Sequence, residues 1–167
     1  MKKFTFIFAI IGMVLLQSCS SSDDRIDHDT IAEVFEVTAT FNPQNNFSRT
    51  ILLNPAIYNS DKVLVYRLAG NVNGRDLWNL LPQNYFFNDG TFSHSYNFDF
   101  TNADVNIFME GYDLAGLPPG ATYNQTFRVV IIPAFASNFR VAAFDVTDYY
   151  AVISNFGIND NTIKKLQ

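Results

Sequence analysis

The fold class is clearest in residues 92–100, which read FSHSYNFDF. One set of alternate positions is apolar or aromatic and comprises Phe92, His94, Tyr96, Phe98 and Phe100. The positions between them are polar and comprise Ser93, Ser95, Asn97 and Asp99. Since successive side chains of a strand point to opposite faces, this period of two predicts a half-buried β-strand. His94 is therefore expected on the buried face.

Working outward, the same reasoning predicts strands at residues 33–41, 47–53, 63–69, 76–81, 85–87, 105–109 and 126–132, with a further one at 140–146. Residues 63–69 and 126–132 are largely apolar on both faces, which favours central positions in a sheet. Asn73-Gly74 and Gly90 suit hairpin turns because they tolerate positive φ, and residues 117–120 (LPPG) are expected to form a rigid loop. Strands at this spacing predict an all-β fold, an antiparallel β-sandwich of about eight strands, Ig-like or jelly-roll-like.

One short helix is predicted near the C-terminus, at residues 149–156. Thr147 or Asp148 can cap its first turn, and Gly157 can end it. Its apolar residues recur at helical spacing and are Tyr149, Val152, Ile153 and Phe156. Residues 158–167 are expected to dock as a short final strand or helix.

Composition narrows the functional classes. Of 167 residues only 16% are charged, while 17 are Phe and 8 are Tyr, a balance that excludes intrinsic disorder. With 11 Lys and Arg against 16 Asp and Glu, the net charge is −5, so a basic nucleic-acid footprint is absent. The single Cys excludes an intramolecular disulfide framework and any multi-Cys metal site. No cofactor is expected.

The first 18 residues have the pattern of a signal peptide. Lys2 and Lys3 precede an apolar run from Phe4 to Leu16, which is too short for a bilayer span of about 20 residues. Residues 16–19 (LQSC) resemble a bacterial lipobox, in which the cysteine, here Cys19, is lipidated and becomes the mature N-terminus. Acyl chains on Cys19 would anchor the protein to a membrane without spanning it.

Residues 19–30 are expected to form a flexible tether before a sandwich domain at 31–167. The tether begins CSSSDD, a composition that cannot bury apolar area. It resembles the acidic export signal of surface-exposed outer-membrane lipoproteins in the Bacteroidota, although a plain solvated linker is the alternative. Asp29-Thr30-Ile31 resembles the O-glycosylation motif of that phylum. The mature chain keeps 9 Lys and Arg against 16 Asp and Glu, a net charge of −7, so the lipid alone would hold it at the membrane.

Several segments share a more specific pattern: 63–68 (VLVYRL), 77–83 (LWNLLPQ), 86–90 (FFNDG), 97–101 (NFDFT) and 127–134 (FRVVIIPA). Across most of residues 31–160 they resemble a family of small cell-envelope lipoproteins of the Bacteroidota. Some members of that family carry a collagen-like segment between the lipidated cysteine and the domain, which this chain lacks. The resemblance implies a cell-envelope domain and brings no known activity or catalytic residue.

The search for catalytic groups yields little. A Gly-x-Ser-x-Gly elbow and a His-Glu-x-x-His motif are both missing from the sequence. His28 lies in the tether, and His94 is expected to be a core histidine with one hydrogen bond. The alternative is a hydrolase that uses His94 or a carboxylate pair such as Asp99 and Asp104, which flank a predicted turn.

Binding is the second functional class. Four aromatic residues near predicted turns could form a ligand platform, namely Trp78, Tyr85, Tyr112 and Tyr123. A polysaccharide could stack on such rings, another envelope protein could dock there, or the rings could serve core packing alone. Arg67 and Arg128 lie within apolar strands and need partners if they are buried. The acidic side chains near predicted turns also leave a loop Ca²⁺ site open, although they lack EF-hand spacing.

Overall fold

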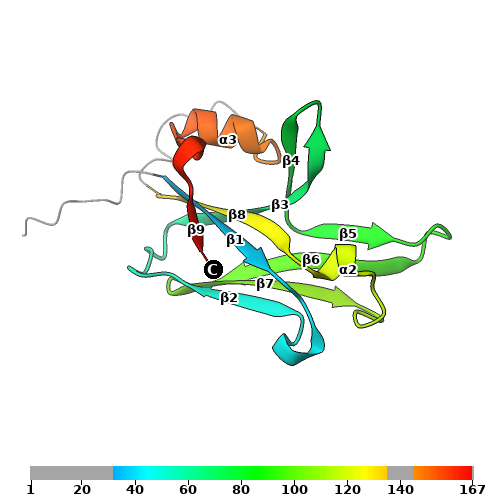
Figure 1. The fold of residues 1–167 in the computed structure, drawn as a ribbon. Coiled ribbons are helices and arrows are strands. Elements are labelled where there is room, and N and C mark those ends of the chain that lie inside the picture. Colours follow the sequence, from blue (N-terminus) through cyan, green and yellow to red (C-terminus); the bar gives the residue numbers. More distant parts are fainter. Residues whose placement is uncertain (1–31, 135–144, 167) are drawn as a thin grey trace, which may run out of the picture.

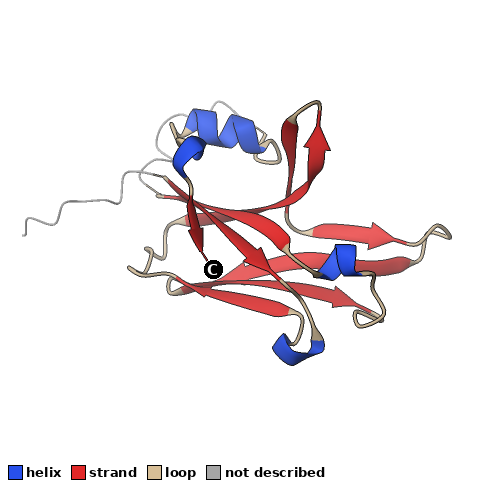
Figure 2. Cartoon of the chain, in the orientation of Figure 1, coloured by secondary structure: helices blue, strands red, loops and turns tan. Residues whose placement is uncertain are grey.

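The computed structural model describes residues 32–134 and 145–166 (Figure 1). Within them nine strands form two sheets that pack face to face, and helices account for only a few turns (Figure 2). The predicted all-β sandwich with one short C-terminal helix is confirmed. The strand predicted at residues 140–146 lies for the most part outside the described residues.

The first sheet has five strands in the order β4, β3, β8, β1 and β9. Their bounds are Arg75–Leu80, Lys62–Val72, Gln125–Ile132, Glu33–Ala39 and Lys164–Leu166. Neighbours are antiparallel except β1 and β9, which pair in parallel through Phe35–Val37 and Lys164–Leu166. Strands β3 and β8, predicted to be central from their two apolar faces, both lie inside the sheet. A final strand was one of the two alternatives expected for residues 158–167, but its parallel pairing with β1 was not foreseen.

The second sheet has four antiparallel strands in the order β2, β7, β6 and β5. Their bounds are Ser48–Leu52, Asp104–Gly111, Phe92–Phe100 and Gln83–Phe86. Two hairpin turns use the residues expected of them, since Asn73 and Gly74 join β3 to β4 with φ of 53° and 80°, and Gly90 has φ of 84° before β6.

Helix α3 spans Tyr149–Asn155, close to its predicted range. The side chain of Asp148 caps it by accepting hydrogen bonds from the backbone N–H groups of Tyr150 and Ala151. Two short 3-10 turns, η2 (Pro43–Asn45) and η4 (Asp160–Thr162), flank the sheets. The expected rigid loop at residues 117–120 is partly wrong, because Pro119–Thr122 forms the short helix α2. A proline fits the first helical turn, where its missing N–H would have no partner.

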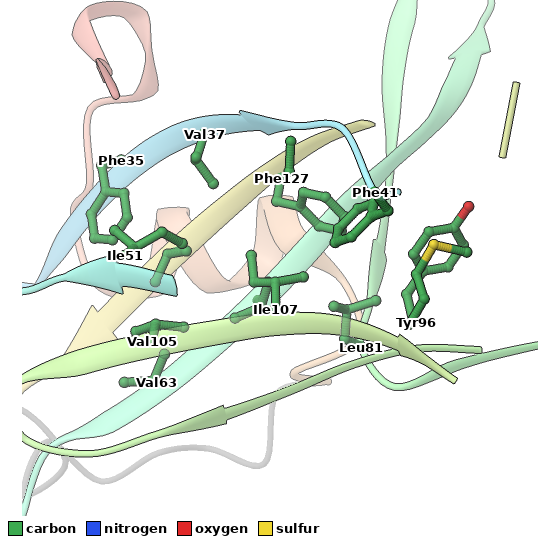
Figure 3. Packing of buried hydrophobic residues seen from close by; sticks show 14 of the residues in the cluster. Phe35, Val37, Phe41, Ile51, Val63, Leu81, Tyr96, Val105, Ile107 and Phe127 are labelled. Atoms are coloured by element: carbon green, nitrogen blue, oxygen red, sulfur yellow. The ribbon is translucent and has the colours of Figure 1, made fainter. Parts of the chain in front are cut away.

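The main core fills the space between the two sheets (Figure 3). Its most buried members are Val37, Phe41, Val65, Tyr96, Val105, Ile107, Phe127 and Val129. The face predicted for the first strand is confirmed, since Phe35, Val37, Ala39 and Phe41 all belong to this cluster. Phe41 meets Phe127 and Tyr96 edge-on, at centroid distances of 5.9 and 6.2 Å.

A second core lies on the outer face of the five-stranded sheet, beneath α3 (Figure 1). The sheet contributes Tyr66, Trp78, Val130 and Ile132, and the helix contributes Tyr149, Val152 and Ile153. The hydroxyl of Tyr66 donates a hydrogen bond to the carbonyl oxygen of Val146 at 2.6 Å. The five-stranded sheet is therefore covered on both faces, as its doubly apolar strands require.

Strand β6 departs from the expected alternation at its ends. His94 and Tyr96 are buried, but Phe92 and Phe100 are each 43% exposed because the strand ends project beyond the packed centre. Ser95 is buried although it lies among the polar positions. The side-chain amide of Asn97 donates hydrogen bonds to the Ser95 hydroxyl and to the Glu110 carboxylate, and so lies against the small Ser95 side chain.

Replacing Phe127 tests the main core. Phe127→Ala removes a fully buried ring that contacts two other aromatic rings. We expect the free energy of unfolding to fall by about 3–5 kcal/mol, the usual cost of such a cavity. Val72→Ala, at a position that is 54% exposed, is the control and should change it by less than about 0.5 kcal/mol. Equal effects in urea unfolding would contradict this placement of the core.

Candidate functional site

Two arginines on opposite faces of the five-stranded sheet have very different partners. Arg128 points to the outer face and forms ion pairs with Glu36 at 3.4 Å and Asp160 at 3.2 Å. Its guanidinium donates a hydrogen bond to the Tyr149 hydroxyl at 2.8 Å and lies 4.2 Å from the centre of the Trp78 ring. The two carboxylates compensate the positive charge of Arg128, so its role is to hold the outer face of the sheet together.

Arg67 follows Tyr66 on β3, and Tyr66 lies opposite Arg128 in the ladder between β3 and β8. The side chain of Arg67 therefore points to the other face of the sheet and enters the space between the two sheets. The guanidinium donates hydrogen bonds to Gln125 Oε1, at 3.0 and 2.5 Å, and to the Tyr85 hydroxyl at 2.9 Å. Its carbon lies 4.4 Å from the centre of the Tyr96 ring. Among residues 32–134 and 145–166, no carboxylate lies within 4.0 Å of this guanidinium. Every partner of Arg67 there is neutral.

The residues around Arg67 come from both sheets and form what we name the Arg67 cluster: Arg67, Tyr85, His94, Tyr96 and Gln125. The Tyr85 ring stacks on the His94 ring at 4.8 Å with an interplanar angle of 4°. The Tyr96 hydroxyl donates to the carbonyl oxygen of Ala121, and the Gln125 amide donates to those of Gly120 and Tyr123. These contacts fix α2 and the start of β8 against the same end of the second sheet.

His94 is 8% exposed, and the expectation that it is a buried histidine is confirmed. Its Nδ1 lies 3.0 Å from the Ser93 hydroxyl oxygen. Burial first, and then the nearby positive charge of Arg67, hold the pKa of His94 below its usual value. The ring is accordingly neutral at physiological pH.

The carboxylates considered for hydrolysis occupy exposed or half-buried hairpin positions. Asp99 pairs with Asn106 in the ladder between β6 and β7. Asp104 accepts a hydrogen bond from the Thr101 hydroxyl at 2.7 Å. Within the described part of the chain, no group of three or more His, Cys, Asp or Glu side chains is arranged to hold a metal ion.

The structure separates Trp78 from the other three aromatic residues considered as a ligand platform. Trp78 is 5% exposed and lies in the second core beneath α3. Tyr85 is half-buried in the Arg67 cluster, whereas Tyr112 and Tyr123 are 98% and 58% exposed. Tyr85, Tyr112 and Tyr123 share one end of the sandwich, because Gly111 pairs with His94, which faces Tyr85, and Tyr123 lies two residues before the start of β8.

Three further aromatic residues at this end were missed by the sequence reasoning. Phe86, Phe87 and Phe92 are 61%, 56% and 43% exposed at the hairpin between β5 and β6. The Phe86 and Phe92 rings meet edge-on at 6.0 Å. The signal was present in the sequence, since these residues flank the turn Asn88-Asp89-Gly90, where side chains project from a hairpin tip.

Hydrogen bonds within the turn stabilise the hairpin that carries these rings. Asp89 accepts hydrogen bonds from the backbone N–H and the hydroxyl of Thr91, and both bonds lower the pKa of its carboxyl group. The backbone N–H of Phe87 donates to the carbonyl oxygen of Thr91 at 2.9 Å. An aromatic surface is thus held on an ordered turn.

Comparison of the chain with protein-family models, with curated proteins and with solved structures found no match. In the two described ranges, none of the helices has the length and apolar character that a membrane span requires. Cys19 and the tether lie outside the described residues.

The state of His94 gives a pH-dependent prediction. Because its pKa is lower in the folded protein than its unfolded value of about 6.5, the unfolded chain binds the extra proton first as the pH falls. The contribution of His94 to stability should therefore be complete above pH of about 6.5 and decline as the pH drops toward the lowered folded-state value. Urea unfolding of the protein and of His94→Gln across this range isolates the contribution, and NMR titration reports the pKa directly.

His94→Ala should cost about 2–4 kcal/mol of stability, as for other large-to-small core substitutions. His28→Ala, in the predicted tether, is the control and should leave the free energy of unfolding unchanged. A folded-state pKa of His94 at or above 6.5, together with unchanged stability of His94→Ala, would contradict a buried structural role and favour a catalytic one.

Proposed function

We propose that this protein is a lipid-anchored lipoprotein of the outer membrane, facing the cell surface, and that it acts as a non-enzymatic binding module. The anchor is the lipid on Cys19, and residues 20–30 link it to the sandwich domain at 31–167. The supporting sequence features are the signal-peptide pattern, the lipobox-like residues 16–19 and the Ser/Asp-rich tether. The resemblance to Bacteroidota envelope lipoproteins also supports a lipid-anchored envelope protein.

The observation that carries the binding role is the placement of the exposed aromatic residues relative to the tether. Strand β1 begins at Glu33, opposite Ile131, and ends at Ala39, opposite Gln125. Gln125 belongs to the Arg67 cluster, so this cluster and the hairpin between β5 and β6 lie at the far end from the start of β1 (Figure 1). Phe86, Phe87, Phe92, Tyr112 and Tyr123 are exposed at that far end. A flexible tether that joins the start of β1 to the anchor leaves this far end free to face away from the membrane.

Exposed aromatic rings on ordered hairpins and loops are suited to binding, because they supply contact area at little conformational cost. Isolated exposed apolar side chains occur elsewhere too, among them Leu52 and Phe100 near the opposite end. What distinguishes the far end is the concentration of aromatic side chains there. A polysaccharide or another envelope protein is the expected partner.

A hydrolase has no comparable support. The His94 ring is buried against Tyr85, and its one hydrogen-bond contact is with the neighbouring Ser93. Asp104 accepts a hydrogen bond from the Thr101 hydroxyl, and Asp99 is exposed on β6 opposite Asn106 of β7.

Membrane attachment is tested by Cys19→Ala. We expect this variant to leave the membrane fraction, because the lipid is the only anchor proposed, and to keep a β-rich circular dichroism spectrum. Ser22→Ala is the matched control from the same segment and should stay in the membrane pellet. Cell fractionation followed by immunoblotting measures both, and a Cys19→Ala protein that remains in the pellet would refute the anchor.

The binding role is tested at the hairpin tip. Phe86→Ser and Phe87→Ser remove exposed rings, so they should weaken retention of isolated envelope material on the immobilised protein without lowering its thermal unfolding temperature. Leu52→Ser, at a position that is 77% exposed near the opposite end, is the control. Equal retention by all three variants and the unchanged protein would count against this end as the binding surface.

A further inference from the structure

We propose that the end of the sandwich at which β1 begins rests on the bilayer that holds the lipid of Cys19, and that the loop between β2 and β3 contacts the membrane interface. This inference rests on the anchor in the proposed function. It adds the surface by which the folded domain meets the membrane.

The first step of the argument is the composition of that loop. Residues 50–60 read TILLNPAIYNS and contain no charged side chain. They lead from β2 to the start of β3, at the same end of the sandwich as the start of β1 (Figure 1). Leu52 and Tyr58 are 77% and 53% exposed, and Pro55 and Ala56 are exposed between them. Exposed apolar side chains together with a tyrosine are typical of surfaces at the boundary between lipid and water.

Backbone hydrogen bonds hold this loop beside the turn between β6 and β7. The N–H of Leu53 donates to the carbonyl oxygen of Ala103 at 2.7 Å, and the N–H of Ile57 donates to that of Asn102 at 2.8 Å. The same turn begins with Phe100, which is 43% exposed, and no charged residue separates Phe100 from Ala103. Two adjoining uncharged segments with a fixed backbone therefore present apolar side chains at this end.

The acidic residues that follow these two segments have their carboxylates engaged within the protein. Asp61 is only 7% exposed and accepts hydrogen bonds from the backbone N–H groups of Tyr58 at 3.0 Å and Ala134 at 3.2 Å. Asp104 is half-buried and accepts its hydrogen bond from the Thr101 hydroxyl at 2.7 Å. Neither carboxylate projects from the loops toward a bilayer.

The loops at the far end differ in this respect. Asp89 is exposed in the turn between β5 and β6, and Asp113 is exposed in the loop after β7. A charged side chain is costly to place in a membrane. At the near end, the exposed charges Glu33 and Lys62 lie on strand ends and have opposite signs, and Asp99 points to the outer face of the four-stranded sheet. The near end is thus the better suited of the two to contact lipid.

The length of the linker favours the same end. Ala32 lies 13 residues after Cys19, and a flexible chain of that length has a mean end-to-end distance of about 20 Å. The nine residues of β6, which run from the far end to the near end, span about 30 Å. The far end could reach the bilayer only with the linker stretched alongside the domain, at a cost in conformational entropy.

The experiment locates the loop in the full-length lipidated protein, reconstituted in vesicles of phosphatidylcholine, a lipid without net charge. Because the single native cysteine, Cys19, carries the lipid in the proposed function, one added cysteine can be labelled with a fluorophore at a unique position. Tyr58→Cys and Ala56→Cys place the label on the loop, and Phe87→Cys, at a far-end position that is 56% exposed, is the matched control. Flotation with the vesicles reports attachment, and thermal unfolding reports whether each variant is folded.

We expect spin-labelled lipid in the bilayer to quench both loop labels and to leave the Phe87→Cys label bright. Iodide in the surrounding water should quench the Phe87→Cys label several-fold more strongly than either loop label. Equal quenching at the two ends, or the reverse pattern, would overturn the inference.

A charge added to the loop tests whether its apolar side chains make the contact. Leu52→Glu should abolish lipid quenching of the Ala56→Cys label, because a carboxylate opposes contact with the bilayer. Val72→Glu, at a position that is 54% exposed on the hairpin between β3 and β4, is the control and should leave the quenching unchanged. Quenching that survives Leu52→Glu would contradict the proposed contact.

Flotation separates this inference from the proposed function on which it rests. A protein that floats with the vesicles while both loop labels stay in water overturns the inference alone and leaves the anchor standing. A protein that does not float refutes the anchor, and the inference fails with it.

Discussion

Strand β8 lies at the centre of the five-stranded sheet and buries both of its faces, and most of the architecture follows from that burial. Phe127, Val129 and Ile131 point into the main core, whereas Val130 and Ile132 point into the second core. A strand that is apolar on both sides needs a layer on each side. The four-stranded sheet provides one layer and α3 provides the other, so even a seven-residue helix contributes buried apolar area to the domain.

The same constraint explains why the two arginines have separate roles. Arg67 and Arg128 occur on neighbouring strands within this doubly buried sheet, but they project to opposite faces. On the outer face, the chain returns through α3, η4 and β9 and brings Tyr149 and Asp160 to Arg128. On the inner face, the neighbouring strands offer only amides, hydroxyls and rings. Charge compensation is therefore local to the face that the C-terminal segment covers.

Much of the fold could be predicted from the sequence, because period-two alternation is a local signal. The strands at residues 33–41 and 92–100, the Asn73-Gly74 turn and the Asp148 cap are each encoded within a few residues. The parallel pairing of β9 with β1 could not be predicted, since it depends on where α3 directs the chain. The exposed ends of β6 were missed because alternation predicts a face and contains no information on where the opposing layer stops.

The candidate site was less accessible to sequence reasoning for a related physical reason. His94 could be assigned to the buried face, and Arg67 could be recognised as needing partners. The partners of Arg67 are Gln125 and Tyr85, which lie 58 and 18 residues away in the sequence, so only the packing of the two sheets brings them together. Trp78 lies apart from the other three aromatic residues of the predicted platform because it belongs to the second core, which no local pattern identifies as a separate layer.

Arg67 stands where the inward face of β3 ends. It follows Val63 and Val65 on that face, and Ala69, two residues further, is exposed within the register shift between Leu68 and Gly70. An apolar side chain at this last inward position could pack against the Tyr96 ring, but it would leave the buried Oε1 of Gln125 without its donor. With arginine at this position, its guanidinium donates hydrogen bonds to Gln125 and Tyr85 and lies over the ring of Tyr96. Such an arrangement restricts the motion of the guanidinium and links strands β3 and β8 of one sheet to β5 and β6 of the other, which an apolar side chain at this position could not do.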